Sequence, residues 1–457
     1  MGIILPCQIL CQTQKDSSEE SDQYSSSANN TSHLPSESST SSSTLCSQPS
    51  LPSVPSLHQN QDQITLSQYC NVITLKPSPS NSSYISSLIL SGKFLYSASS
   101  DGQVRLWNLD SEKNSNILSL PENYIVAATG SSVKSIVVSG DKLFSAHQDH
   151  KIRVWKVNSV KGDQQKHDYK CIATLPTLND RFSTLFFAKN YIKVHRHKSR
   201  TWVHHVDAVS ALVLSHDNSL LYSASWDRSF KIWRTTDFKC LESVSNAHDD
   251  AINDVALSYD GHVYTGSADR KIKVWKRVKV DGSSLRMKHT LEATLEKHKS
   301  AVNALALSSN GSVLYSGACD RSILVWERSD GGDDEIGVVE GRRSSNSSSG
   351  AMVVVGALRG HSKAILCLAV VSSDLVCSGS ADYTVRVWKR STSSPVDKSY
   401  TCLAVLEGHR RPVKCLTASL DNNSSCLISS DGTSYLVYSG SMDCEIKVWR
   451  IWIPKSN

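Results

Sequence analysis

VYTGSADRKIKVW, residues 263–275, is the stretch of sequence that decides the fold. It runs through small and apolar residues to Asp269 and then alternates polar and apolar residues up to Trp275. Alternation with a period of two places successive side chains on opposite faces of a β-strand. We therefore predict a tight turn at Asp269, followed by a strand that carries Trp275.

An aspartate, five intervening residues and a tryptophan recur in this way seven times along the chain. The pairs are Asp101 and Trp107, Asp149 and Trp155, Asp227 and Trp233, Asp269 and Trp275, Asp320 and Trp326, Asp382 and Trp388, and Asp443 and Trp449. The shortest spacing of successive tryptophans, 42 residues, fits one four-stranded unit. The longest, 78 residues between Trp155 and Trp233, requires an insertion.

Two more positions recur with these pairs. A Ser or Thr stands four residues before every aspartate: Ser97, Ser145, Ser223, Thr265, Ser316, Ser378 and Ser439. Five repeats also carry a histidine ahead of an earlier strand: His205, His248, His298, His361 and His409. A buried imidazole or carboxylate is tolerated only where its polar atoms have partners. We expect these side chains to have a structural role in each repeat.

Together these motifs resemble the WD40 repeat. The resemblance implies an all-β fold, a seven-bladed WD40 β-propeller. It also implies, within each blade, a hydrogen-bonded chain from the tryptophan indole through Ser or Thr to His and Asp. Such a satisfied network fixes the register of the strands.

Closure of the ring requires a strand from the other end of the chain. The sequence stops eight residues after Trp449, which leaves the seventh blade one strand short. An unpaired outer strand would expose its backbone groups to association. We predict that residues 68–76, which precede the first repeat, pair with the last blade.

Composition divides the chain into domains. Residues 1–63 are rich in Ser, Asn, Gln, Thr and Pro and predict a disordered tail, because they cannot bury enough apolar surface to offset the entropy of ordering. Residues 64–451 are expected to form the propeller and residues 452–457 a C-terminal tail. Thirteen cysteines without any Cys-x-x-Cys pair favour free thiols and a cytoplasmic or nuclear location.

Three insertions interrupt the repeats, and loops are where propellers differ in function. The third of them, near residues 421–433, is polar and is assigned no role. Residues 176–204 lie between blades 2 and 3; from Arg181 to Val206 the sequence carries six Lys or Arg, several aromatic residues and no acid. Its charge would attract an acidic partner, and its aromatic residues are expected to pack on the propeller. A solvated lid is the competing interpretation. Residues 329–354 predict a flexible loop in blade 5, with Ser345 as a candidate phosphorylation site.

Candidate partner-binding residues come from the first insertion and from the turns. The insertion contributes Lys189, Lys193, Arg196, Lys198 and Arg200. The turns contribute Trp226, Arg228, Arg270 and Arg321, and a loop of blade 7 contributes Arg410 and Arg411. Trp and Arg are common at interaction hot spots. Turn residues are also often basic simply because they are solvated.

At longer range, residues 175–212, LPTLNDRFSTLFFAKNYIKVHRHKSRTWVHHVDAVSAL, resemble the plant JINGUBANG-like WD-repeat proteins. The resemblance extends over about residues 65–451. It implies an insertion between the second and third blades and a plant regulatory scaffold of the cytoplasm or nucleus, acting through transcription regulators.

The leading functional interpretation is a non-catalytic protein-interaction scaffold, monomeric on its own, that docks protein partners or an acidic or phosphorylated peptide on its loop face. No phosphate loop, nucleophile elbow, metal-ligand spacing or transmembrane segment is found, so we expect no cofactor, no metal and no enzyme activity. One alternative is a substrate receptor of a ubiquitin ligase, although no repeat Trp is followed by the Asp-x-Arg typical of that class. Nucleic-acid binding through the basic insertion is the other, less favoured alternative.

Overall fold

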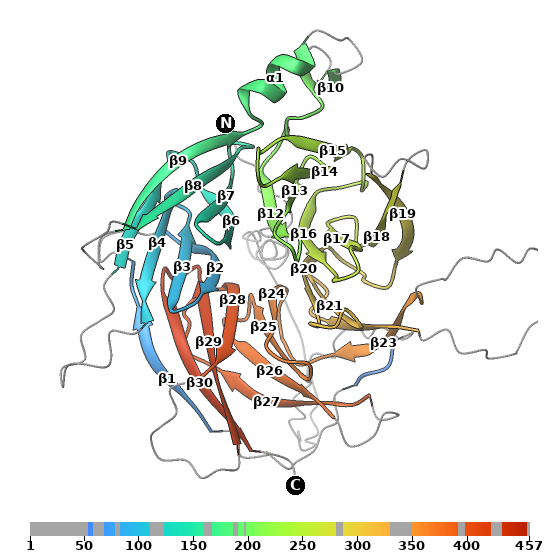
Figure 1. Ribbon diagram of the computed structural model, residues 1–457. Coiled ribbons are helices and arrows are strands. Elements are labelled where there is room, and N and C mark those ends of the chain that lie inside the picture. The colour runs from blue at the N-terminus through green and yellow to red at the C-terminus, as the bar shows by residue number, and fades with distance from the viewer. Residues whose placement is uncertain are drawn as a thin grey trace, which may run out of the picture.

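Seven four-stranded antiparallel sheets form a closed ring in the computed structural model (Figure 1). The structure describes residues 54–57, 68–77, 83–109, 123–159, 167–185, 191–195, 198–279, 287–329, 350–391, 398–421 and 432–454. The sheets pack side by side around a central axis, so the expectation of a seven-bladed WD40 propeller is confirmed.

Each of blades 1 to 3 is made of strands that follow one another in the chain, from the innermost to the outermost. Blade 1 comprises β2 (Ile85–Ser91), β3 (Phe94–Ser99), β4 (Gln103–Asn108) and β5 (Asn123–Ala128). Blade 2 comprises β6 (Val133–Ser139), β7 (Lys142–His147), β8 (Ile152–Ser159) and β9 (His167–Leu175). Blade 3 comprises β12 (Val209–Leu214), β13 (Leu220–Ser225), β14 (Phe230–Arg234) and β15 (Cys240–Val244).

Blades 4 to 6 repeat this order. Blade 4 comprises β16 (Ile252–Leu257), β17 (Val263–Ser267), β18 (Ile272–Lys279) and β19 (Met287–Leu295). Blade 5 comprises β20 (Val302–Leu307), β21 (Val313–Ala318), β22 (Ile323–Arg328) and β23 (Met352–Leu358). Blade 6 comprises β24 (Ile365–Val370), β25 (Leu375–Ser380), β26 (Val385–Arg390) and β27 (Tyr400–Leu406).

Blade 7 joins the two ends of the propeller. Its inner strands are β28 (Val413–Leu420), β29 (Gly432–Ser441) and β30 (Ile446–Pro454), and its outermost strand is β1 (Gln68–Leu75). β1 pairs antiparallel with β30, for example Cys70 with Arg450 (Figure 1). The predicted closure by the segment near residues 68–76 is therefore present. β30 extends to Pro454, three residues beyond the boundary expected at 451.

The core lies between blades. Within the described residues, buried apolar side chains form seven clusters, and each cluster combines residues of two adjacent blades. The third strand of every blade carries the repeat tryptophan, and each of these tryptophans is buried. Because each blade has apolar residues on both faces, it must be covered by a neighbour on each side, and only a closed ring provides this.

One part of the sequence interpretation is corrected by the N-terminal segment. Residues 54–57 fall within the tail expected to be disordered, yet Val54 is only 4% exposed and Ser56 forms a parallel bridge with Ala357 of β23. The physical reason is that Val54 and Leu57 reach apolar surface on blade 5 that the composition of the whole tail did not suggest. The rest of residues 1–63 lies outside the described residues.

Candidate functional site

The turn between the second and third strands of every blade has the same geometry. The repeat aspartate is followed by a residue with φ between 66° and 83°: Gly102, His150, Arg228, Arg270, Arg321, Tyr383 and Cys444. In blade 4, for example, Asp269 Oδ1 accepts the backbone N–H of Lys271 at 2.9 Å, across the turn. Local hydrogen bonding by Asp favours such tight turns. All seven turns therefore lie on the same face of the ring, which we call the turn face, and the six turns without glycine each present one side chain there.

Beneath the turn face, blades 3 to 7 share one hydrogen-bonded network. In blade 4, Trp275 Nε1 donates to Thr265 Oγ1 at 2.9 Å, that hydroxyl lies 2.7 Å from His248 Nε2, and His248 Nδ1 lies 2.8 Å from Asp269 Oδ2. This pattern assigns the proton to Nδ1, which donates to the carboxylate. The same contacts, at 2.7 to 3.0 Å, recur in the other four blades.

The network controls the charge of the buried carboxylates. Burial alone would raise the pKa of Asp269, but hydrogen bonding and charge from His248 outweigh it and lower this pKa to about 2. Asp320 has a pKa of about 2 for the same reasons, with His298 as its partner. Burial lowers the pKa of His205 and His361, so these rings are neutral at pH 7. Each Asp is therefore an ionised, fully engaged structural group.

Blades 1 and 2 lack the loop histidine and use arginine instead. Arg105 and Arg153 stand four residues after Asp101 and Asp149 and pair with them at 3.1 and 2.6 Å. In both blades the tryptophan still donates to its serine, at 2.8 and 2.9 Å. His147 supplies the imidazole in blade 2 from the second strand, with Nε2 2.8 Å from Ser145 Oγ. The sequence analysis did not identify these residues. A Lys or Arg four residues after the repeat Asp also occurs in four other blades, and this repetition was a signal for Arg105 and Arg153.

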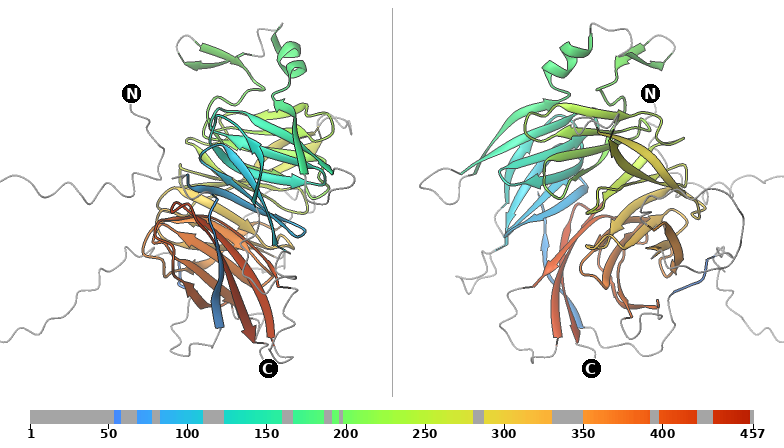
Figure 2. Two further views of the ribbon diagram at one scale, coloured as in Figure 1. Left: turned by 90° about the vertical axis from the view of Figure 1, so that its left-hand side faces the viewer. Right: turned by 45° about the vertical axis from the view of Figure 1, so that its right-hand side comes forward.

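The insertion between blades 2 and 3 extends outward from the ring. It forms helix α1 (Leu178–Leu185) and a hairpin of β10 (Tyr191–His195) and β11 (Lys198–Thr201), both beyond the outer edge of the blades in each view (Figures 1 and 2). Phe182 is 59% exposed, so the expectation that the aromatic residues pack on the propeller is wrong for this residue. Trp202, by contrast, packs on the cluster between blades 2 and 3.

Both ends of the insertion are fixed to blade 3. Asp180 Oδ2 accepts the backbone N–H of Cys240 at 3.3 Å, and the buried Lys231 donates to the carbonyl of Trp202 at 2.6 Å. Lys193, Lys198 and Arg200 lie on the hairpin strands. The predicted Lys189 and Arg196 lie outside the described residues, as does Ser345 in the loop between β22 and β23. The fixed ends allow the insertion to serve as a defined projection from the rim.

Three of the predicted turn arginines form a basic arc. Arg228, Arg270 and Arg321 occupy the equivalent turn position of the adjacent blades 3, 4 and 5, and Tyr383 continues the series in blade 6. Arg228 and Arg270 are exposed and Arg321 is partly exposed. No side chain in the described ranges forms an ion pair with any of the three. We call these three residues the Arg arc.

The remaining candidates border the Arg arc or lie apart from it. Trp226 precedes Asp227 in blade 3, and Lys134 of blade 2 lies over its ring, 5.2 Å from the centroid. In blade 6, Lys363 lies over Tyr383 at the same distance. Arg410 and Arg411 are exposed on the blade 7 loop, which blade 6 separates from the arc. The structure thus brings Trp226 and the Arg arc onto neighbouring blades but not the blade 7 arginines.

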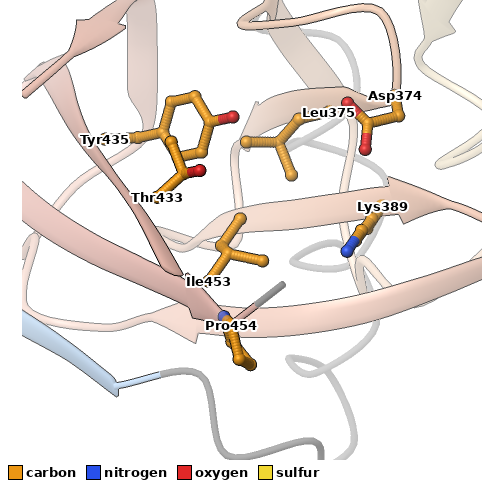
Figure 3. Close-up of a pocket in the computed structure, with 7 residues that line it drawn as sticks. All are labelled: Asp374, Leu375, Lys389, Thr433, Tyr435, Ile453 and Pro454. Carbon is orange, nitrogen blue, oxygen red and sulfur yellow. The ribbon is translucent and has the colours of Figure 1, made fainter. Parts of the chain in front are cut away.

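The opposite face of the ring carries a shallow pocket between blades 6 and 7. Asp374, Leu375 and Lys389 of blade 6 face Thr433, Tyr435, Ile453 and Pro454 of blade 7 (Figure 3). Among the described residues, no group of three His, Cys, Asp or Glu side chains could hold a metal ion. No helix in the described ranges is long and apolar enough to cross a membrane. The nine described cysteines are free.

The inner strands contain a carboxyl group that the sequence reading did not single out. Asp254 on β16 accepts the backbone N–H of Leu305 on β20 at 2.8 Å, which joins blades 4 and 5. Ser87 and Ser135 accept backbone N–H groups from the next blade in the same way, at 3.3 and 3.2 Å. Burial raises the pKa of Asp254 to about 6. Asp254 therefore takes the role that a serine has in blades 1 and 2. Because a carboxyl group titrates and a hydroxyl does not, the contact between blades 4 and 5 depends on pH.

Asp254→Asn is expected to stabilise the protein at pH 7.5 but not at pH 4.5. The folded protein binds the Asp254 proton more tightly than the unfolded chain, so the wild type loses stability as pH rises from about 4 through about 6. Since Asp254 is partly exposed, solvent screens its charge, and we expect a gain of about 1 kcal/mol rather than the full free-energy equivalent of the pKa shift. Urea midpoints at the two pH values check this. An equal effect at both pH values would contradict it.

The family follows from the repeats and their network. The family model described as "WD domain, G-beta repeat" matches residues 70–108, 196–234, 238–276, 289–327, 352–389 and 400–450, more than half of the chain. The chain therefore belongs to the WD40 repeat family. Blade 2, in which arginine and a second-strand histidine replace the usual network, lies largely outside these matches.

Comparison with individual proteins gives more distant likenesses. Protein ROOT INITIATION DEFECTIVE 3 from Arabidopsis thaliana is 32% identical over 41% of this chain and 40% of its own length. The Ribosome biogenesis protein WDR12 homolog from Drosophila persimilis is 26% identical over 55% of this chain and 54% of its own length. The chain thus spans about half the length of these relatives or less. The crystal structure of the WD40 β-propeller domain of Doa1 shares the fold, with a TM-score of 0.54, 17% identity and coverage of 84% of this chain and 97% of that one.

Proposed function

We propose that this protein is a non-catalytic scaffold that docks an acidic or phosphorylated segment of a protein partner on its turn face, over the Arg arc. The observation that carries the proposal is the repetition of one feature: three adjacent blades present arginine from the same turn position, and none has an acidic partner among the described residues. Guanidinium groups bind carboxylates and phosphates through paired hydrogen bonds.

Arginines on the opposite face provide an internal contrast. Arg328 of blade 5 donates to Asp260 of blade 4 at 2.7 Å, and Arg390 of blade 6 pairs with Glu327 of blade 5. These arginines join neighbouring blades and are already neutralised. The Arg arc has no such structural use, so its charge remains available to a ligand.

The surroundings of the Arg arc favour binding of an extended segment. The networks beneath the turns hold the turn backbones in place, so little conformational entropy is lost when a partner binds. Trp226 offers an aromatic surface beside Arg228, and Tyr383 offers another beyond Arg321. The insertion, which carries Lys193, Lys198 and Arg200 in its hairpin strands, projects from the rim next to blade 3 (Figure 1).

We further infer a regulatory adaptor role in a plant cell, in the cytoplasm or nucleus. The Arabidopsis relative, by its name a root initiation protein, and the resemblance of residues 175–212 to the JINGUBANG-like proteins support this inference. The partners would then be regulatory proteins with acidic or phosphorylated segments, transcription regulators among them.

Charge reversal of the Arg arc is expected to weaken acidic-peptide binding. Arg228→Glu/Arg270→Glu/Arg321→Glu should weaken binding of a labelled Glu-rich peptide at least about ten-fold, because attraction becomes repulsion. Fluorescence anisotropy measures the affinity, with the same peptide carrying Gln for Glu as the uncharged probe. Binding to the wild type should also weaken as salt increases.

A matched control carries the same charge change elsewhere. Lys239, Lys279 and Lys288 are exposed and lie at connections between third and fourth strands, away from the turn face. Lys239→Glu/Lys279→Glu/Lys288→Glu should keep the affinity within about two-fold, apart from long-range effects that salt removes. Equal losses in both variants, or no loss in the Arg arc variant, would refute docking on the arc.

A further inference from the structure

A short segment of the N-terminal tail pairs with the outermost strand of blade 5. Residues 54–57, Val-Pro-Ser-Leu, run parallel to β23 along its outer edge. The segment lies on a different side of the ring from β1, which belongs to blade 7 (Figures 1 and 2). Leu57 donates its backbone N–H to the Ala357 carbonyl at 3.0 Å, and Ala357 donates to the Pro55 carbonyl at 2.9 Å. This is the hydrogen-bond pattern of a peptide bound by strand addition.

The side chains of the segment fill two different crevices. Val54 is buried in the cluster between blades 4 and 5, while Leu57 packs on the cluster between blades 5 and 6. Pro55 and Ser56, between them, are exposed. An extended segment with apolar residues three positions apart places them on opposite faces of a strand, which here means on opposite sides of blade 5.

Polar contacts hold both ends of the segment. Arg359 Nη2 donates to the Val54 carbonyl at 2.9 Å, and the Tyr400 backbone N–H donates to the Leu57 carbonyl at 3.0 Å. Gly356 on β23 leaves space for the Leu57 side chain, because a Cβ at this position would lie 2.4 Å from Leu57 Cγ. The three nearest atoms to such a Cβ all belong to Leu57. The absence of a side chain at Gly356 therefore makes room for Leu57 of the tail segment and not for a side chain of blade 5.

We propose that the outer edge of blade 5 is a peptide-binding site for short apolar-Pro-Ser-apolar segments, and that residues 54–57 are its tethered occupant. The sequence PSLPSVPSL, residues 49–57, repeats Pro-Ser-apolar three times, so the tail carries more than one copy of such a segment. Blade 5 already has its four strands, so the segment is an addition to a complete blade. The site is independent of the Arg arc.

The proposal is tested by vacating the site and refilling it with a peptide. Val54→Asp/Leu57→Asp in the full chain places charges in both crevices and should release the tail segment. A fluorescein-labelled peptide with the sequence of residues 49–60 should bind this variant saturably. It should bind the wild type at least about ten-fold more weakly, because the tethered segment competes at a high effective concentration.

Gly356→Ala provides the specific control. Added to the vacated variant, it should leave the melting temperature unchanged but weaken binding of the peptide at least about ten-fold, because the new methyl group occupies the space of Leu57. A peptide with Ala in place of Leu57 should show a much smaller difference in affinity between the vacated variant with Gly356→Ala and the vacated variant without it. Failure of the peptide to bind the vacated chain, or equal affinities with and without Gly356→Ala, would overturn the proposal.

Discussion

Leu75→Asp is expected to destabilise the folded ring by at least about 4 kcal/mol, because it places a charge in the seam that closes it. Leu75 is 1% exposed and packs with Ile85 and Trp107 of blade 1 and with Ile446 of blade 7. It ends β1, the strand from the start of the propeller that completes the last blade. Thermal unfolding and limited proteolysis of the purified variant measure the loss.

Tyr69→Asp on the same strand is the control for this change. Tyr69 is 47% exposed and lies opposite Ile451 in the ladder between β1 and β30. The substitution should therefore change stability by less than about 1 kcal/mol. If both variants unfolded at the temperature of the wild type, the seam at β1 would not hold the ring together.

His248→Ala is expected to lower the free energy of unfolding by about 3 kcal/mol, because removing one partner of a buried pair leaves the other uncompensated. The Asp269 carboxylate, 5% exposed, would lose its imidazole donor at 2.8 Å, and the Thr265 hydroxyl would lose its acceptor. His216→Ala, at an exposed ring that contacts Tyr259, should cost less than about 0.5 kcal/mol. Urea midpoints of the two variants give the comparison.

Coupling with Asp269 separates the network from a general packing effect. Asp269→Ala and His248→Ala remove the same contact, so the double variant should be more stable than the sum of the single effects predicts, by at least about 1.5 kcal/mol. Strict additivity would show that the two side chains stabilise the blade independently.

Much of the fold was predictable because the repeat motifs specify local geometry. The Asp turn, the alternating strand and the buried tryptophan each have a physical signature, and seven copies define the number of blades. Closure was predictable because the last blade lacked a strand and an unpaired edge is unfavourable. The outward direction of the insertion was not, since it depends on anchors such as Asp180 to Cys240 that join residues sixty positions apart.

The site was predictable only in part, for the same reason. Residues such as Arg228 and Arg270 could be singled out from their place after the turn Asp, because the turn is local. Arg105, Arg153 and His147 were missed because they replace the loop histidine from other strands of the blade. The docking of residues 54–57 was missed because two apolar residues in a polar tail gain their burial only from blade 5.

Photo-crosslinking tests the central claim, docking of an acidic segment on the Arg arc, most directly. A Glu-rich peptide with a photoreactive group at one end is crosslinked to the full chain at low salt, and the attachment sites are mapped by mass spectrometry. We expect crosslinks within the turns around Arg228, Arg270 and Arg321, and their loss at high salt. Crosslinks concentrated on the opposite face, near Lys239 and Lys288, would contradict the account.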